Sequence, residues 1–145
     1  MGRKFLHVLL LKTYSNHKKR SRQYFQQLQL TEGQPKVLTI LSGMEGCQQK
    51  ELAQACGVEP ATMTSLLKNM EHSGLIYKER MSLPGGKWAY SIFLTERGRG
   101  LSGEVMDMVE QLEETAFRDF TEGEKETFLK LFAKVAENLD KVNEQ

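Results

Sequence analysis

The fold is decided by residues 49–72, which read QKELAQACGVEPATMTSLLKNMEH. Apolar residues recur at helical spacing on both sides of Gly57, which is the residue type that most often ends a helix. Pro60 suits the first turn of the helix that follows. The pattern therefore predicts two short helices, residues 49–56 and 60–72, joined by a tight turn.

The side chains around this turn meet the physical demands of a helix-turn-helix. Ala53 is small enough for the two helices to cross closely. Gly57 tolerates the positive φ that a tight turn requires. Met63, followed by Leu66, directs apolar surface from the second helix into the core. The spacing of these residues predicts a helix-turn-helix motif.

A two-stranded hairpin is predicted after the second helix. Residues 75–81 and 88–95 are rich in β-forming residue types, and larger and smaller side chains alternate along the second run. Residues 82–87, between the two runs, contain the turn-forming sequence Pro-Gly-Gly. A helix-turn-helix followed by such a hairpin, or wing, has the plan of a winged helix-turn-helix, which is mainly α with a small β-hairpin.

Amphipathic helices are expected on both sides of this region. Residues 4–28 lack Gly and Pro and carry apolar residues at both ends of a basic middle, which predicts one helix roughly 37 Å long. So small a domain cannot cover a helix of that length, so we expect its apolar ends to pack against another chain. Capping boxes at 31–34 and 121–124, and a cap at Thr95, predict the starts of three more helices.

Composition and charge describe a globular protein with two oppositely charged ends. Of 145 residues, 39% are hydrophobic and 27% are charged, which excludes wholesale disorder. Residues 1–30 carry seven bases and no acid, whereas residues 100–145 carry five bases and twelve acids. Opposite charge predicts that the two ends lie near each other, within one chain or between chains, although two solvated helix faces would give the same pattern.

The sequence gives no reason to expect an enzyme, a cofactor or a metal. It contains no P-loop, nucleotide-binding glycine motif or catalytic-triad signature, and its three His have no metal-ligand spacing. The apolar run at residues 5–11 is too short for a signal peptide or a membrane span. We expect a cytoplasmic protein without membrane contact, with Cys56 directed inward and Cys47 exposed after a glycine-containing turn.

Short stretches of this plan match one known family. They read QKELA at 49–53, GV at 57–58, PATMT at 60–64, GLI at 74–76 and LTERG at 94–98. Together they resemble the MarR family of bacterial transcriptional regulators over residues 31–103, and the order of the expected elements extends the resemblance to the whole chain. The resemblance implies one domain spanning 1–145, with a winged-helix DNA-binding region at 31–99. Residues 1–30 and 100–145 would form a helical dimerisation region.

The resemblance further implies a transcriptional repressor that binds double-stranded DNA as a homodimer, on a pseudo-palindromic operator. The second helix of the motif would enter the major groove, where Asn, Lys and Thr side chains can read bases, and the start of the first helix would meet phosphates. The residues expected to contact DNA are Gln48, Gln49, Lys50, Ala61, Thr62, Thr64, Ser65, Lys68, Asn69, Arg80 and Lys87.

Two positions depart from the family pattern. The acidic-arginine-arginine run near the wing tip falls on Gly86, Lys87 and Trp88, and the arginine early in the second helix of the motif falls on Ser65. A lysine sits less well than a guanidinium in a narrow minor groove. These departures leave an alternative open, namely a winged-helix module that binds protein and not DNA.

A small-molecule effector is a further implication of the resemblance. Members of the family often bind small aromatic anions between the dimerisation helices and the winged region. Tyr14, His17 and Tyr24 are the residues expected to contact a small aromatic or anionic effector, with Thr13 and Trp88 as further candidates. Ordinary packing would also explain each of these side chains.

Overall fold

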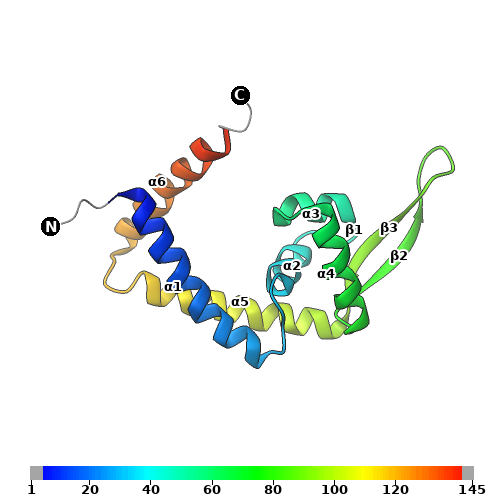
Figure 1. The fold of residues 1–145 in the computed structure, drawn as a ribbon, viewed down its shortest axis with the longest axis horizontal. Coiled ribbons are helices and arrows are strands. Elements are labelled where there is room, and N and C mark those ends of the chain that lie inside the picture. The colour runs from blue at the N-terminus through cyan, green and yellow to red at the C-terminus, as the bar shows by residue number, and fades with distance from the viewer. Residues whose placement is uncertain (1–4, 142–145) are drawn as a thin grey trace. The chain divides into compact units, whose positions relative to one another are not determined.

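A computed structural model describes residues 5–141, and this range contains six helices and three strands (Figure 1). In chain order the elements are α1 (Leu6–Gln27), α2 (Gln34–Ser42), β1 (Cys47–Gln48), α3 (Gln49–Cys56), α4 (Pro60–His72), β2 (Ile76–Ser82), β3 (Trp88–Leu94), α5 (Glu96–Ala116) and α6 (Glu122–Lys141). The predicted fold, mainly α with a small β-hairpin wing, is confirmed. Two compact units divide between Glu110 and Gln111, and each is described by itself.

The core of the first unit joins α2, α3 and α4 to the sheet and to the first turns of α5. Helix α4 shows how the sequence builds it, because Met63, Leu67 and Met70 recur on one face and are fully buried. Burial of each such side chain stabilises the fold by about 1.5–3 kcal/mol. The opposite face of α4 is thereby directed outward.

The helix-turn-helix has the predicted bounds. Helix α3 ends at Cys56, and Gly57 caps it with a φ of 65° in the left-handed region. Pro60 occupies the first turn of α4, where a missing backbone N–H leaves no helical hydrogen bond unmade. Ala53 is buried on α3, which contacts α4. These local signals explain why the sequence pattern located the motif correctly.

The wing is an antiparallel hairpin that projects away from the helices of its unit (Figure 1). Strands β2 and β3 pair from Ile76–Leu94 at the root to Ser82–Trp88 near the tip. The sequence pattern did not predict β1, whose two residues are too few to show an alternation. They pair with Ile92 and Ser91 of β3, which makes a three-stranded sheet in the order β1-β3-β2.

Two of the three predicted helix caps are confirmed. The Thr95 hydroxyl accepts a hydrogen bond from the Gly98 N–H at 3.0 Å, and Thr121 and Glu124 form a reciprocal capping box. The box at 31–34 is only half formed, because the Gln34 side chain accepts from the Thr31 N–H at 3.1 Å while the Gln34 N–H donates to the Thr31 carbonyl. Helix α2 therefore begins at Gln34, later than predicted.

Buried side chains continue on both sides of residues 31 and 99, the expected limits of the winged region. Leu30 is buried in the core of the first unit, with Phe25 of α1 packed against it. Ser102, Val105 and Met108 of α5 are also buried, and the Ser102 hydroxyl donates to the Leu38 carbonyl at 3.3 Å. The division into a winged region at 31–99 and a dimerisation region at 1–30 and 100–145 stays a prediction.

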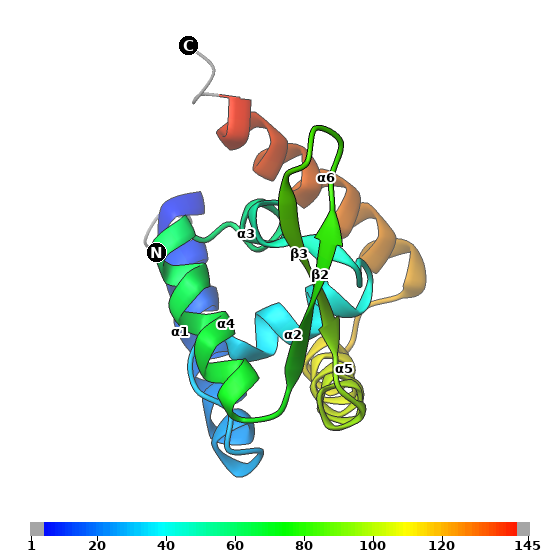
Figure 2. The ribbon, with the colours of Figure 1, turned by 90° about the vertical axis from the view of Figure 1, so that its right-hand side faces the viewer.

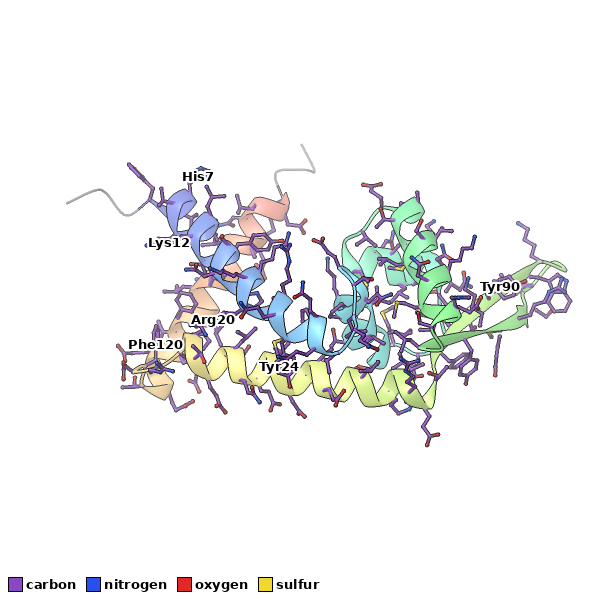
Figure 3. All side chains as sticks on the ribbon, turned by 60° about the horizontal axis from the view of Figure 1, so that its bottom comes forward. His7, Lys12, Arg20, Tyr24, Tyr90 and Phe120 are labelled. Carbon is purple, nitrogen blue, oxygen red and sulfur yellow. The ribbon has the colours of Figure 1, made fainter. Side chains whose placement is uncertain are left out.

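The second unit contains the end of α5, the connecting turn and α6. Phe117 contacts Phe120 and Phe128 edge-on, with ring centroids 5.3 and 5.8 Å apart, and Phe132 stacks on Phe128 at 5.5 Å. Phe120 is labelled at this turn in Figure 3. Within its described span, Glu122–Lys141, α6 buries none of its side chains.

Candidate nucleic-acid interface

The outer face of α4 carries a set of small and polar side chains that are all exposed. Its members are Ala61, Thr62, Thr64, Ser65, Lys68 and Asn69. Figure 2 shows α4 at one end of the first unit with the hairpin beside it, and α4 contacts β2. The arrangement presents one convex, polar helix face next to a projecting hairpin.

A hydrogen bond that the sequence did not predict joins α3 to α4 on this surface. The Gln49 side-chain amide donates to the Thr64 hydroxyl at 2.7 Å, and that hydroxyl donates to the Pro60 carbonyl at 3.0 Å. The Thr64 hydroxyl thus makes both of its hydrogen bonds within the motif. The Thr64 methyl group remains free to contact another molecule. Gln49 holds the start of α3 against the first turns of α4.

The start of α3 offers backbone donors to an anion. Gln48 precedes the helix in an extended conformation and makes no side-chain cap hydrogen bond. The first N–H groups of a helix have no intrahelical acceptor, and the helix dipole adds positive potential at this end. Lys50 is exposed in the same turn, whereas Gln48 and Gln49 are half-buried.

The hairpin carries two exposed cations, Arg80 on β2 and Lys87 at the tip. The Arg80 guanidinium lies 4.3 Å from the centroid of the Trp88 ring. Trp88 is 58% exposed, so the pair forms a cation–π contact on the surface. Tyr90 is the residue opposite Arg80 in the strand register and is labelled on the hairpin in Figure 3. Trp88, a further candidate for an effector contact, thus lies on the wing.

An ion pair ties the base of the wing to the loop before β1. Arg99 of α5 donates to the Glu45 carboxylate at 2.7 Å, and the other carboxylate oxygen accepts from the Leu94 N–H at 2.8 Å. The Arg99 hydrogen bond lowers the pKa of Glu45 below its ordinary value, and the Leu94 N–H adds to the effect. The carboxylate thus joins the α2–β1 loop to the end of β3 and the start of α5.

A cavity of about 630 Å³ lies between α1 and residues 30–36, wholly within the first unit. Of the residues expected to contact an effector, Tyr14 and His17 line this cavity, whereas Tyr24 and Thr13 are not among its lining residues. Their role in binding an effector stays a prediction. Arg22 on α1 and Lys36 on α2 also line this cavity. The sequence pattern missed both, because basic residues at these positions resemble ordinary solvated helix surface.

Both cysteines are buried, which corrects the expectation that Cys47 is exposed. Cys47 is 8% exposed because β1 places it in the sheet opposite Ile92. Burial raises the pKa of the Cys47 thiol, and the charge of Glu51 raises it further. Burial likewise raises the pKa of Cys56. A protonated, covered thiol is a poor nucleophile.

Residues 5–141 contain no group of three His, Cys, Asp or Glu side chains that could hold a metal ion. Over the same range, no helix is both long enough and apolar enough to cross a membrane.

The MarR family model matches residues 30–82. The HTH-type transcriptional regulator YybA of Bacillus subtilis is 31% identical over 119 residues, which are 81% of this chain and 77% of YybA. This chain belongs to the MarR family. It is a transcriptional regulator and not an enzyme.

Other relatives of this MarR-family chain agree in sequence and fold. YwhA of Bacillus subtilis, also an HTH-type transcriptional regulator, is 29% identical over 101 residues, which are 70% of this chain and 71% of YwhA. The crystal structure of MarR is 30% identical, covers 99% of this chain and 97% of its own, and superposes with a TM-score of 0.78. A crystal structure of S. aureus MepR with DNA shares the fold at a TM-score of 0.82 and 23% identity, over 94% of this chain and 99% of MepR.

Proposed function

We propose that this chain is a homodimeric repressor that binds a pseudo-palindromic operator in double-stranded DNA and is released by a small-molecule effector. The observation that carries the proposal is the division of α4 into a fully buried apolar face and an exposed polar face beside a cationic hairpin. S. aureus MepR, which shares this fold, has been crystallised in a complex with DNA.

In this proposal α4 lies in the major groove. A major groove about 12 Å wide admits one α-helix with its side chains. Asn69 can read adenine and Lys68 can read guanine, or either can bind a phosphate. The Thr62 and Thr64 methyl groups can contact thymine methyl groups, and Ser65 can bond a base edge or a phosphate. Ala61 is small enough to let the first turn approach closely.

Phosphates flanking the groove would bind at the start of α3. Its uncapped first turn favours an anion through backbone N–H groups and the helix dipole. Lys50 adds a cation, while Gln48 and Gln49 contribute amide groups. Because Gln49 already bonds Thr64 at 2.7 Å, the two helices would approach the DNA as one connected surface.

The wing would bind beside this groove. Arg80 and Lys87 are exposed on the hairpin, and a guanidinium fits a narrow minor groove better than an ammonium. We assign Arg80 to the minor groove or its edge, and Lys87 to neighbouring phosphates. The Trp88 ring supports the Arg80 guanidinium through the cation–π contact at 4.3 Å.

Exposed apolar residues on two separate parts of the chain support the homodimer. Phe5, Leu6, Val8, Leu9 and Leu11 at the start of α1 are all exposed, and so are Phe128, Leu129, Leu131, Phe132 and Leu139 of α6. A monomer seldom leaves so many large apolar side chains in water. A symmetric partner would cover them and would present two copies of α4 to two half-sites one or more helical turns apart.

The cavity between α1 and residues 30–36 is the proposed effector site. Its volume of about 630 Å³ suits a small organic molecule. Tyr14 and Phe25 offer aromatic surface, and His17, Arg22 and Lys36 offer donors to an anion. The proposed ligand is therefore a small aromatic or anionic molecule, with no resident cofactor required.

The direct test is a gel shift with the DNA upstream of the gene, with wild-type protein and Ser65→Glu. A carboxylate in the major groove would face base acceptors and phosphates, so we expect affinity to fall by at least about tenfold. Circular dichroism and sedimentation should not change, because Ser65 is exposed. Ser65→Ala, the control, should lose less.

The outcomes separate the candidate functions. Equal binding by wild type and Ser65→Glu would remove this face from the interface. No binding by wild type to any upstream duplex would favour the alternative of a winged-helix module that binds protein. Wild-type affinity should also fall steeply as salt rises, because phosphate contacts release counterions.

A further inference from the structure

We infer that Lys36 couples the cavity beside α1 to the helix-turn-helix, so that an anion bound in the cavity weakens DNA binding by drawing the Lys36 ammonium away from the end of α3. The inference rests on the effector site proposed above and names the residue through which a ligand in that site would change DNA binding.

Lys36 makes contact with both regions. It lies in the first turn of α2 and lines the cavity. Its ammonium also donates to the carbonyl of Cys56, the last residue of α3, at 3.2 Å. Pro60, four residues beyond Cys56, has no backbone N–H with which to bond that carbonyl. The Lys36 ammonium therefore caps α3 at the negative end of its dipole.

The carbonyl that Lys36 caps adjoins the turn that sets the direction of α4. Gly57 and Val58 follow it, and their N–H groups donate to the carbonyls of Gln54 and Ala53 at 3.1 Å. The backbone of the turn therefore satisfies two carbonyls at the end of α3, and the Lys36 ammonium supplies a donor to the Cys56 carbonyl. Without the ammonium, the Cys56 carbonyl would turn toward water and the turn would loosen.

A second contact carries the same coupling. Gly33, which also lines the cavity, packs directly against Leu66 of α4, since a Cβ added to Gly33 would lie 3.0 Å from Leu66 Cδ2. Gln34 and Pro35 next to it are buried. A single short segment thus forms one wall of the cavity, holds the end of α3 and supports α4.

The charges around the cavity explain why an anion would attract Lys36. Lys18 is 3.3 Å from the Glu32 carboxylate, which partly neutralises it. Arg22 lies on α1 and Lys36 on α2, so a ligand carboxylate in the cavity would be drawn toward both. A carboxylate is a stronger acceptor for an ammonium than a carbonyl, and the flexible lysine stem lets the ammonium change partners.

The test uses benzoate as a probe, with benzamide as its neutral isostere and chloride added to keep ionic strength constant. Fluorescence anisotropy measures the affinity for a labelled operator duplex at saturating benzoate. For wild type we expect benzoate to weaken DNA binding by about tenfold, which is in the usual range of allosteric coupling. In Lys36→Met, which keeps the aliphatic stem but lacks the ammonium, the change should be less than about twofold.

Two control variants separate coupling from ligand affinity. Arg22→Met also removes a cation from the cavity, so it should require more benzoate. At saturation, however, it should show the wild-type loss of DNA affinity. Lys36→Arg retains the charge and should retain most of the coupling. Benzamide should have little effect on any of these proteins.

A readout without DNA keeps the coupling separate from the proposed function. Backbone amide NMR signals of Gly57 and Val58 should shift with benzoate in wild type and not in Lys36→Met. If wild type bound no duplex, the proposed function would fail, and these signals would still decide the coupling. The inference is overturned if Lys36→Met keeps the full wild-type effect at saturation, or if benzoate changes neither DNA affinity nor these signals in wild type.

Discussion

At the scale of single residues, the wing has a different distribution of charge from the one that the family pattern implies. The position expected to hold the second arginine of the family run is Trp88, and the guanidinium comes from Arg80 on the opposite strand. The two groups lie 4.3 Å apart, so the guanidinium is next to the position that the family pattern gives to an arginine. The absence of an arginine at position 88 alone would suggest that the wing has lost a cation there. The structure places the Arg80 guanidinium beside that position.

We predict that Trp88→Leu weakens operator binding by about three- to fivefold, the loss expected from one exposed cation–π contact. In this variant the Arg80 guanidinium would lose the cation–π contact with the indole ring but keep its charge. The salt dependence of DNA binding should therefore change little. Arg80→Met should weaken binding more and flatten the salt dependence. Trp88→Phe, which keeps an aromatic face, is the matched control. Equal affinities for wild type and Trp88→Leu would contradict the assignment of Arg80.

A second prediction at the residue scale concerns Glu45 and the dependence of the protein's stability on pH. Its pKa is lowered in the folded protein, so its contribution is present above the ordinary carboxyl pKa of 4.5 and is lost as pH falls through the lower folded value. At pH 7, Glu45→Gln should lower the Tm by roughly 2–4 °C. The difference should shrink as the pH is lowered below the ordinary value. A difference that is constant between pH 7 and pH 3 would contradict this role.

At the scale of elements, the start of helix α5 approaches the backbone of Leu75, the residue before β2, very closely. A Cβ added to Gly98 would lie within van der Waals overlap of the Leu75 carbonyl, and Leu75 also accepts from the Thr95 N–H at 3.1 Å. The start of α5 is thus held against the root of β2. Gly100, two residues further, has open space around it.

Gly98→Ala and Gly100→Ala should therefore have opposite effects on the free energy of unfolding. We expect Gly98→Ala to destabilise the protein by about 3 kcal/mol or more, because backbone must move. Gly100→Ala should stabilise it by about 0.5–1 kcal/mol, since alanine is the better helix former. Chemical denaturation measures both. A similar effect of the two substitutions would show that the close approach at Gly98 does not limit the fold.

The elements also show what could be predicted from the sequence and why. The bounds of α3 and α4 follow from local chemistry at Gly57 and Pro60, so a sequence pattern locates them. Strand β1 is two residues long and exists because β3 pairs with it, which no local pattern reveals. The hydrogen bonds Gln49–Thr64, Lys36–Cys56 and Glu45–Arg99 span 15, 20 and 54 residues.

At the scale of the whole molecule, the exposed apolar side chains of α1 and α6 carry the prediction of a dimer. Leu131, which is 54% exposed on α6, should lie in the interface. Leu131→Glu should shift the protein from dimer to monomer in sedimentation at micromolar concentration, because a buried, unpaired carboxylate is costly. Lys130→Glu, a charge change at the neighbouring exposed position, is the control and should remain dimeric. A Leu131→Glu protein that stays dimeric would place the interface elsewhere.

The basic and acidic ends of the chain belong to the same scale. Their proximity, within a chain or between chains, stays a prediction, and so does the division of the chain into winged and dimerisation regions. Within residues 5–141, both α1 and α6 leave several large apolar side chains exposed, among them Leu9 of α1 and Leu131 of α6.

The place of the indole group has a practical consequence. The chain contains one tryptophan, and it lies at the end of β3 next to the hairpin tip. Its ultraviolet emission therefore comes from a single point of the molecule without any attached dye. A rapid-mixing experiment that follows this emission would time the arrival of the hairpin on a duplex, separately from every other step of association.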